Sequence, residues 1–332
     1  MPRAQFCEAC GSPVDDGPSP TVSPAGRSVG GCDRCGGEVG DDGYCTACGF
    51  RALEPVTVDD RGAQASATHR GKRHERNEDA VAMTETSEGW PVLVVADGVS
   101  VSPNPHLAAA AAVEAAAKHL DGEPFAGEPD LAAAVAAAHE AACAVPAEGD
   151  PLWESEGGRP ACTIVVAVAT GGTVVTANVG DARVHLLRDV EGAWAATQLT
   201  SDDSLAARAI AAGDDPVEAL NSPDGHTLVA WLGGDAPELA VHLATRPATP
   251  GDLVLASSDG LWNYAPTDEA LAALAKELLP PPPATDALPG AEVAERLAAW
   301  AVAEGGADNV TVALAPVPGR PGPTENDDEE GS

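Results

Sequence analysis

The stretch "VLVVADGVS", Val92 to Ser100, is a run of apolar residues that stops at an aspartate followed by a glycine. A second stretch, "LVLASSDGLW" from Leu253 to Trp262, repeats the pattern and ends its apolar run at Asp259-Gly260. One Asp-Gly pair after a strand is a common turn. Two such pairs, each after a run apolar enough for the protein interior, predict two carboxylates that are brought to one place at the edge of a sheet.

The composition is that of a globular protein with an unusual charge. Of the 332 residues, 44% are hydrophobic and 21% are charged, and because only 3% are aromatic the core must consist of Val, Leu and Ala. The formal charge of −34 disfavours nucleic acid and anionic membranes as partners and suits divalent cations. Neither a bilayer-spanning segment nor a signal-peptide core is found. We therefore expect a cytoplasmic protein, and we further expect it to be a monomer.

Six of the eight cysteines fall in the first fifty residues as three C-x-x-C pairs: Cys7/Cys10, Cys32/Cys35 and Cys45/Cys48. In a reducing compartment such pairs indicate zinc binding rather than disulfides. The second and third pairs can close one tetrahedral thiolate site. The first pair has no partner nearby, so it is either a degenerate second ribbon or a competitor for the same metal. A redox role would need a βαβ context that the sequence lacks.

The pattern of elements divides the chain into four parts. We expect a zinc-ribbon-like segment at 1–50, a linker at 51–64, one large domain at 65–317 and an acidic disordered tail at 318–332. Predicted strands of the large domain are 79–83, 91–97, 162–169, 173–187, 194–200, 238–245, 252–259 and 309–317. Predicted helices are 106–120, 130–145, 202–213, 267–279 and 291–305. Strands come in clusters with helices in pairs between them, which favours an α+β fold of antiparallel sheets with helices outside.

Five aspartates of this domain each lie at the edge of a predicted strand: Asp79, Asp97, Asp181, Asp259 and Asp308. Any one of them could be an ordinary turn or cap residue. Together they suit hard divalent cations, which prefer oxygen ligands and keep several waters. Two ions can share one bridging carboxylate and one hydroxide and so stabilise an in-line displacement. The glycine after Asp97 would let its backbone carbonyl approach an ion.

Seven motifs in order carry a resemblance to a known family: "NEDA", "VVADG", "CTIVVAVA", "NVGDARVHLL", "LTSDDSL", "LVLASSDGLW" and "GGADNVTVAL". Over roughly residues 65–316 the chain resembles the bacterial form of the metal-dependent type 2C protein serine/threonine phosphatases. The resemblance implies a β-sandwich of two antiparallel sheets flanked by pairs of α-helices. It also implies two Mn²⁺ or Mg²⁺ ions, whose bridging hydroxide attacks phosphoserine or phosphothreonine directly.

Site roles follow from the same resemblance, position by position. Asp97 would bridge both metals, and the carbonyl of Gly98 would bind one of them. Asp259 and Asp308 would bind the other metal, while Asp79 would hold metal-bound waters.

Two further positions concern a third metal and the substrate. Asp181 resembles the family's ligand for a weaker third ion, shared with Asp259. In bacterial members an arginine that grips the substrate phosphate stands five residues before the first metal-site aspartate, and here that position is His74. Arg73 and Arg76 flank it, but strand alternation would turn both away from the face that His74 uses. A protonated His74 beside phosphate is the expected substitute, and a surface histidine without a role is the alternative.

Two rival functions remain open. The domain could be a pseudophosphatase that binds phosphoproteins without turnover, or an adaptor whose zinc ribbon captures a partner. The favoured function is a metal-dependent protein phosphatase acting on the products of a Ser/Thr kinase.

Overall fold

The structure, a computed structural model of the chain, describes residues 32, 34–40, 43–62, 64–149, 158–283 and 288–319. It contains two compact units, Met1–Leu53 and Glu54–Ser332. The predicted knuckle of Cys7 and Cys10 lies outside the described residues, as does most of the predicted acidic tail.

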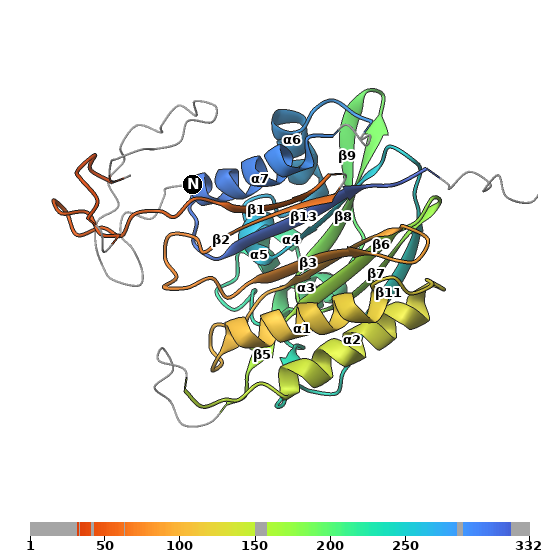
Figure 1. Cartoon of the computed structure of the whole chain (residues 1–332), viewed down its shortest axis with the longest axis horizontal. Coiled ribbons are helices and arrows are strands. Elements are labelled where there is room, and N and C mark those ends of the chain that lie inside the picture. Colours follow the sequence, from red (N-terminus) through yellow and green to blue (C-terminus); the bar gives the residue numbers. More distant parts are fainter. Residues whose placement is uncertain are drawn as a thin grey trace, which may run out of the picture. The chain divides into compact units, whose positions relative to one another are not determined.

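The larger unit contains two antiparallel sheets (Figure 1). One has the order β11-β7-β6-β4-β3, with β3 at Ala80–Glu85, β4 at Pro91–Ala96, β6 at Ile164–Ala169, β7 at Thr173–Val179 and β11 at His242–Pro247. The other has the order β1-β2-β13-β12-β8-β9, with β1 at Thr57–Arg61, β2 at Gln64–His69, β8 at Arg183–Val190, β9 at Ala193–Gln198, β12 at Leu253–Ser257 and β13 at Val310–Pro316. The predicted pair of antiparallel sheets is confirmed.

Helices cover the outer faces of both sheets. The five-stranded sheet carries α1 (Pro105–Leu120) and α2 (Glu128–Cys143), whereas α6 (Asp268–Leu278) and α7 (Gly290–Glu304) pack on the six-stranded sheet (Figure 1). Alanine favours these helices intrinsically, and its small side chain lets α1 and α2 pack closely on β3, β4 and β7. The shorter elements are β5 (Ala161–Cys162), β10 (Leu232–Gly233), α3 (Leu205–Ala212), α4 (Pro216–Leu220) and α5 (Asp259–Trp262).

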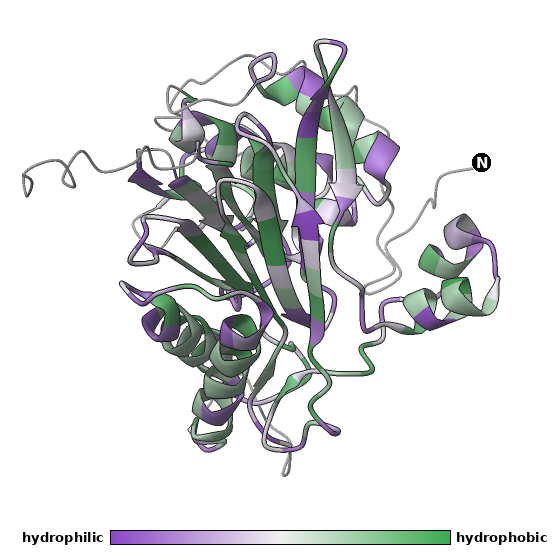
Figure 2. Ribbon diagram, turned by 90° about the vertical axis from the view of Figure 1, so that its right-hand side faces the viewer, coloured by the Kyte–Doolittle hydropathy of each residue, from purple (hydrophilic) through white to green (hydrophobic). Residues whose placement is uncertain are grey.

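The apolar run of β4 is explained by burial on both faces. Val92, Val94 and Ala96 pack in the core beneath α1 and α2. Leu93 and Val95 alternate with them and pack between the two sheets. Burying one Val or Leu side chain stabilises a fold by ~1.5–3 kcal/mol, so a strand of this kind has no solvent face on which a polar residue could be placed. Figure 2 shows the resulting hydrophobic strands of both sheets.

Antiparallel pairing brings the strand ends that carry the predicted aspartates to one edge. Ala96 at the end of β4 pairs with Ala80 at the start of β3, which places Asp97 beside Asp79. Ser257 at the end of β12 pairs with Val312 near the start of β13. The order of strands therefore gathers residues that lie far apart in the sequence.

Three sequence predictions differ from the observed elements. The single strand predicted at 173–187 is two strands in different sheets, because the chain turns at Gly180, where φ is +97°. The predicted linker 51–64 contains β1, an exposed edge strand whose side chains show no hydrophobic alternation. The strand predicted at 238–245 begins only at His242.

No helix among the described residues has the length and apolar character that crossing a bilayer requires.

Candidate functional site

Asp97 is held at the centre of the site by the neighbouring strand segment. Its backbone carbonyl accepts a hydrogen bond from the Thr163 backbone N–H at 2.7 Å, and its own N–H donates to the Thr163 hydroxyl at 3.2 Å. The next residue, Gly98, forms a bridge with Cys162. The backbone at Asp97 is therefore fixed on one side by β5 and on the other by β4.

Gly98 fills a position where a side chain does not fit. A Cβ atom there would lie 2.7 Å from the carbonyl oxygen of Glu78 and 2.9 Å from Pro105. Gly260, in the second Asp-Gly pair, is tighter still, because its Cβ would lie 1.9 Å from the carbonyl oxygen of Asn309. Both Asp-Gly pairs thus place glycine where another backbone segment passes.

Asp79 and Asp259 are linked through Ser258. The Ser258 hydroxyl donates to Asp79 Oδ2 at 2.8 Å and accepts from the Thr311 backbone N–H at 3.0 Å. Asp259 follows Ser258 directly and is the first residue of α5. Ser258 therefore holds the Asp79 carboxylate in place and directly precedes Asp259 in the chain.

Asp308 lies just before β13 and is paired with His74. His74 Nε2 lies 3.0 Å from Asp308 Oδ1, and this hydrogen bond is the main reason that the pKa of His74 is raised. The predicted strand alternation around His74 is wrong, because β2 ends at His69 and the chain turns at 71–73. Arg76 is half-buried and forms an ion pair with Glu78 at 3.1 Å.

Asp181 is the most buried of the five aspartates, at 5% exposure. It follows Gly180 in the turn between β7 and β8, and its backbone carbonyl accepts a hydrogen bond from Trp262 Nε1 at 2.9 Å. Trp262 belongs to α5, which starts with Asp259. The same helix thus carries one aspartate and fixes the backbone of another.

Asp79, Asp97, Asp181 and Asp259 have raised pKa values. Burial raises the pKa of Asp79 and that of Asp181 to about 7. The pKa values of Asp97 and Asp259 are raised well above the usual range, first by burial and then by the negative charges of the other aspartates. Close buried carboxylates cannot all ionise unless positive charge is supplied. The cluster therefore favours either protons or cations.

Divalent cations fit this arrangement. Two buried carboxylate oxygens, Asp79 Oδ1 and Asp259 Oδ1, have no hydrogen-bond partner among the residues that the structure describes. An unpaired buried acceptor is costly, and an oxygen-only donor set is what Mg²⁺ and Mn²⁺ prefer. Within the described ranges only the cysteines form a group of three or more ligand atoms within 4.8 Å of one another. The wider spacing of the aspartates suits ions that keep several waters.

A cleft of about 610 Å³ opens onto the cluster. Asp97, Asp181, Asp259 and Asp308 line it at one end, together with Gly98. Its lining further includes Val99–Ser102, Gly158, Arg159, Ala161, Thr163, Pro223, His226–Leu228, Trp231 and Asp235. His74 is not among the lining residues.

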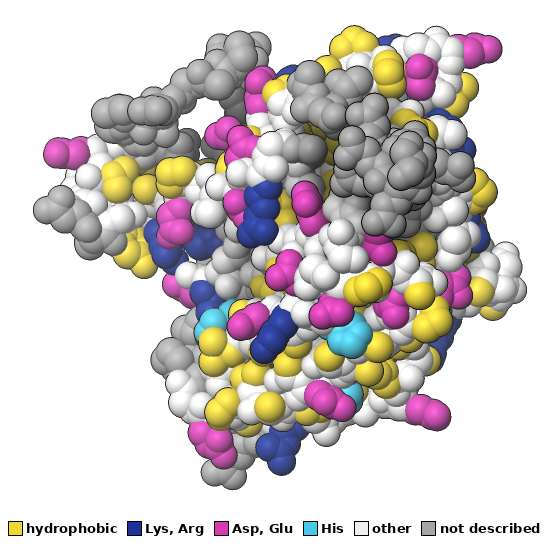
Figure 3. Space-filling view, turned by 45° about the vertical axis from the view of Figure 1, so that its right-hand side comes forward, with side chains coloured by type: hydrophobic (Ala, Val, Ile, Leu, Met, Phe, Trp, Pro, Cys, Tyr) yellow, Lys and Arg dark blue, Asp and Glu magenta, His cyan; other side chains and the backbone are white. Residues whose placement is uncertain are grey.

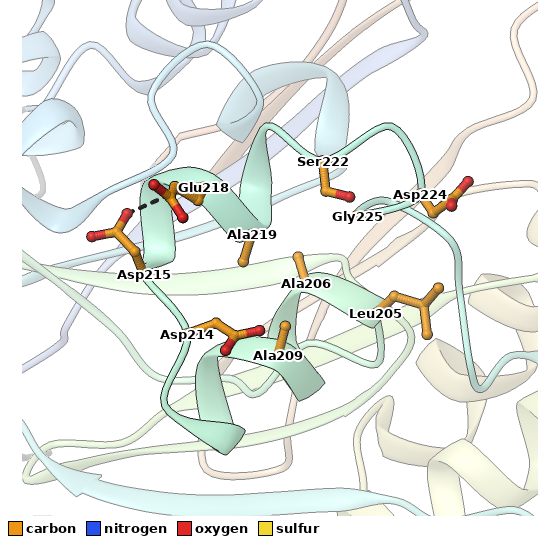
Figure 4. Close-up of a pocket in the computed structure, with 10 residues that line it drawn as sticks. All are labelled: Leu205, Ala206, Ala209, Asp214, Asp215, Glu218, Ala219, Ser222, Asp224 and Gly225. Atoms are coloured by element: carbon orange, nitrogen blue, oxygen red, sulfur yellow. Dashed lines mark hydrogen bonds between the residues drawn. The ribbon is translucent and has the colours of Figure 1, made fainter.

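A second hollow of about 340 Å³ lies between α3 and α4 (Figure 4). Its lining includes Leu205 and three alanines together with Asp214, Asp215, Glu218 and Asp224. Asp215 is engaged in capping, since it accepts a hydrogen bond from the Glu218 backbone N–H at 3.1 Å. None of the described residues predicted for the site lines this hollow. On the face of the molecule that Figure 3 shows, acidic side chains are scattered and do not form a single patch.

In the N-terminal unit, four cysteines converge as predicted. Cys35 Sγ lies 3.3 Å from Cys48 Sγ and 3.5 Å from Cys45 Sγ, and Cys32 Sγ lies 3.6 Å from Cys48 Sγ. A tetrahedral zinc with Zn–S bonds of about 2.3 Å needs sulfur atoms about 3.8 Å apart. The cluster is thus close to the size of a zinc site.

The backbone around the cluster favours a thiolate, the form that binds zinc, at Cys45. Backbone N–H groups, that of Cys48 foremost, lower the pKa of Cys45 to about 6. The Gly37 N–H lowers the pKa of Cys35, but hydrogen bonds with Cys48 and Cys45 outweigh it and raise that pKa to about 12. Gly37 is required because a Cβ there would lie 3.0 Å from Cys45 Sγ.

Sequence reasoning missed the residues that hold the aspartates in place. Asn309 is the clearest example: its Oδ1 accepts from the Glu78 N–H at 2.7 Å, and its Nδ2 donates to the carbonyls of Arg70 and Arg76 at 2.8 and 3.1 Å. This one buried side chain fixes the turn that carries His74 and Asp79. In the sequence, the role of Asn309 is indicated only by its position next to Asp308.

Comparison with known proteins identifies the family. The family model of protein phosphatase 2C matches residues 66–300. This chain belongs to the protein phosphatase 2C family. The serine/threonine protein phosphatase PstP of Mycobacterium tuberculosis is 32% identical over 256 residues, which cover 76% of this chain and 44% of PstP. The match therefore spans less than half of that relative. The serine/threonine phosphatase stp of Listeria monocytogenes is 28% identical over 267 residues, covering 74% of this chain and 92% of stp.

Solved structures of this protein phosphatase 2C family share the fold. The crystal structure of M. tuberculosis PstP/Ppp has a TM-score of 0.60 at 30% identity and covers 79% of this chain and 99% of its own. A structure of the catalytic domain of PstP in complex with two manganese ions has a TM-score of 0.56 at 28% identity, covering 79% of this chain and 100% of its own. The predicted family and fold are confirmed.

Proposed function

We propose that this chain is a metal-dependent protein phosphatase that hydrolyses phosphoserine and phosphothreonine in proteins modified by a Ser/Thr kinase. The observation that carries the proposal is the cluster of aspartates at the end of a cleft, with two buried carboxylate oxygens left without partners. Its relatives support the same activity, since PstP and stp are named serine/threonine phosphatases.

Each side chain of the cluster has a separate task in this proposal. Asp97, the Gly98 carbonyl, Asp259 and Asp308 would hold two Mn²⁺ or Mg²⁺ ions, and Asp181 with Asp259 would hold a weaker third. Bound cations would supply the positive charge that activates a water and stabilises the phosphoryl oxygens. Asp79, oriented by Ser258, would accept hydrogen bonds from that water. The chain needs no nucleophilic side chain, so no phosphoenzyme forms.

His74 would act through Asp308 rather than on the phosphate. Its imidazole is hydrogen-bonded to Asp308 and does not line the cleft. A histidine in this position restricts the rotation of the Asp308 carboxylate through that hydrogen bond. In this proposal His74 is a positioning residue.

The function is tested by hydrolysis of a phosphothreonine peptide by the full chain, with and without Mn²⁺. We expect turnover only with the metal, because without it the ionised carboxylates would repel the phosphate dianion. Mn²⁺ binding without turnover would instead support the pseudophosphatase, which binds phosphoproteins without hydrolysing them.

We further propose that the four-cysteine cluster binds one Zn²⁺. Cys45→Ser should lower the zinc content, measured by mass spectrometry under native conditions, by one ion per chain, because three thiolates hold zinc far less tightly than four. Cys143→Ser is the matched control, since Cys143 is an exposed thiol on α2. Unchanged zinc in Cys45→Ser would contradict the assignment. Deleting residues 1–53 tests the adaptor alternative: an adaptor would lose partner capture, whereas an enzyme would keep the hydrolysis of a small phosphopeptide.

A further inference from the structure

One wall of the cleft is built around Asp235, in the loop after β10. Asp235 Oδ1 accepts a hydrogen bond from Trp231 Nε1 at 3.2 Å, and its Oδ2 accepts one from the Arg159 backbone N–H at 3.2 Å. The aliphatic part of Arg159 lies over Gly234, where an added Cβ would come within 3.3 Å of Arg159 Cγ. Arg159 and Trp231 are thereby held side by side through one carboxylate.

Arg159 supplies the positive charge in the lining of an otherwise acidic cleft. Among the described residues that line the cleft it is the one lysine or arginine, against five aspartates. Its guanidinium makes no hydrogen bond or ion pair within the part of the chain that the structure describes, and the residue is exposed. The Asp235 carboxylate already accepts two N–H groups, which leaves the Arg159 charge available to an incoming anion.

The distance of Arg159 from the aspartate cluster determines what it can contact. Thr163 is bonded to the backbone of Asp97, and Arg159 precedes Thr163 by four residues. Four residues of extended chain span at most ~14 Å, and an extended substrate peptide advances by ~3.3 Å per residue. The Arg159 side chain can point toward or away from the aspartate cluster. Its guanidinium can therefore reach a substrate residue two to four positions from the phosphorylated residue.

We propose that Arg159, held by Asp235 beside Trp231, forms a subsite for an anionic group of the substrate peptide at that distance. The ligand is a carboxylate or a second phosphate, both of which the planar guanidinium can bind through two hydrogen bonds. Trp231 offers the neighbouring peptide segment an apolar surface. The inference rests on the proposed function, because it assumes that a phosphopeptide occupies the cleft.

The test compares four phosphothreonine peptides that differ only at positions two to four from the phosphothreonine: alanines, glutamates, lysines, or one phosphoserine among alanines. For the wild-type full chain with Mn²⁺ we expect kcat/KM to be ~2–5-fold higher for the glutamate peptide than for the alanine peptide, as one exposed ion pair allows. The lysine peptide should be the poorest. The phosphoserine peptide distinguishes a second phosphate from a carboxylate as the preferred group.

Arg159→Gln should abolish this preference through KM, while kcat on the alanine peptide and hydrolysis of p-nitrophenyl phosphate stay unchanged. Arg246→Gln, an equal charge change on the exposed strand β11, is the matched control and should retain the preference. Loss of p-nitrophenyl phosphate hydrolysis in Arg159→Gln would overturn the inference, because Arg159 would then contact the reacting phosphate itself. Equal rates for the glutamate and alanine peptides in the wild type would also overturn it.

A binding measurement separates this inference from the proposed function. Fluorescence anisotropy of the labelled glutamate and alanine peptides reports their affinities whether or not the chain turns over. Discrimination that depends on Arg159 without any turnover would contradict the phosphatase proposal and leave the subsite standing. Turnover without discrimination between the two peptides would support the phosphatase proposal and contradict the subsite.

Discussion

Asp259→Asn should lower the hydrolysis of a phosphothreonine peptide by about 10³-fold or more, which corresponds to about 4 kcal/mol of transition-state stabilisation. The amide keeps the size of the carboxylate but removes the negative charge that would bind a cation. The Asp259 carboxylate is buried near the charges of Asp308, Asp181 and Asp79, and its Oδ1 has no hydrogen-bond partner among the described residues. The measurement is kcat at saturating Mn²⁺ for the wild type and the variant.

A matched control and a stability measurement exclude unfolding as the cause. Asp224→Asn makes the same chemical change at an exposed position in the hollow between α3 and α4, and it should leave activity unchanged. In metal-free buffer Asp259→Asn should melt at a higher temperature than the wild type, because it removes one carboxylate from a mutually repelling group. Full activity in Asp259→Asn would rule out the proposed metal centre.

The core of the fold could be predicted because its signals are local. The apolar runs ending at Asp97 and Asp259 are long enough to be buried on both faces, and alanine has the highest intrinsic helix propensity. These elements alone establish a layered α+β sandwich. The five aspartates could be identified for a related reason: each follows or precedes such a run, so the antiparallel pairing brings them together.

Other features depend on contacts that no local pattern encodes. The break at Gly180 is set by the close approach of Thr163, whose Cγ2 would lie 2.5 Å from an added Cβ. The strand β1 has only exposed residues, so it has no hydrophobic signature. The pairing of His74 with Asp308 joins residues more than two hundred positions apart. Position in a family motif could locate His74 but could not show which way its ring turns.

Divalent cations should stabilise the folded chain, and the stabilisation should be larger at pH 8 than at pH 6. Without cations, the folded state keeps protons on buried aspartates, two of which have a pKa of about 7 against an ordinary value of 3.8. At pH 6 a cation must displace these protons, and each one displaced weakens binding by about 1.4 kcal/mol per pH unit. At pH 8 Asp79 and Asp181 have lost their protons, so a cation binds without having to displace them. The ionised carboxylates also repel one another more strongly at pH 8, and a bound cation relieves this repulsion.

The measurement is the difference in melting temperature with and without Mn²⁺ at each pH. Raised folded-state pKa values make the metal-free chain less stable as pH rises from the ordinary aspartate range through 7, since the unfolded chain has already released those protons. His69 and His185, whose pKa values burial lowers, have the opposite effect, with stability lost as pH falls below 6.5. They act with and without Mn²⁺ alike and so cancel in the difference. The metal-free sample is prepared by dialysis rather than by a strong chelator, so that zinc held by the cysteines is retained. A difference that shrinks from pH 6 to pH 8 would mean that Mn²⁺ does not bind at the buried aspartates.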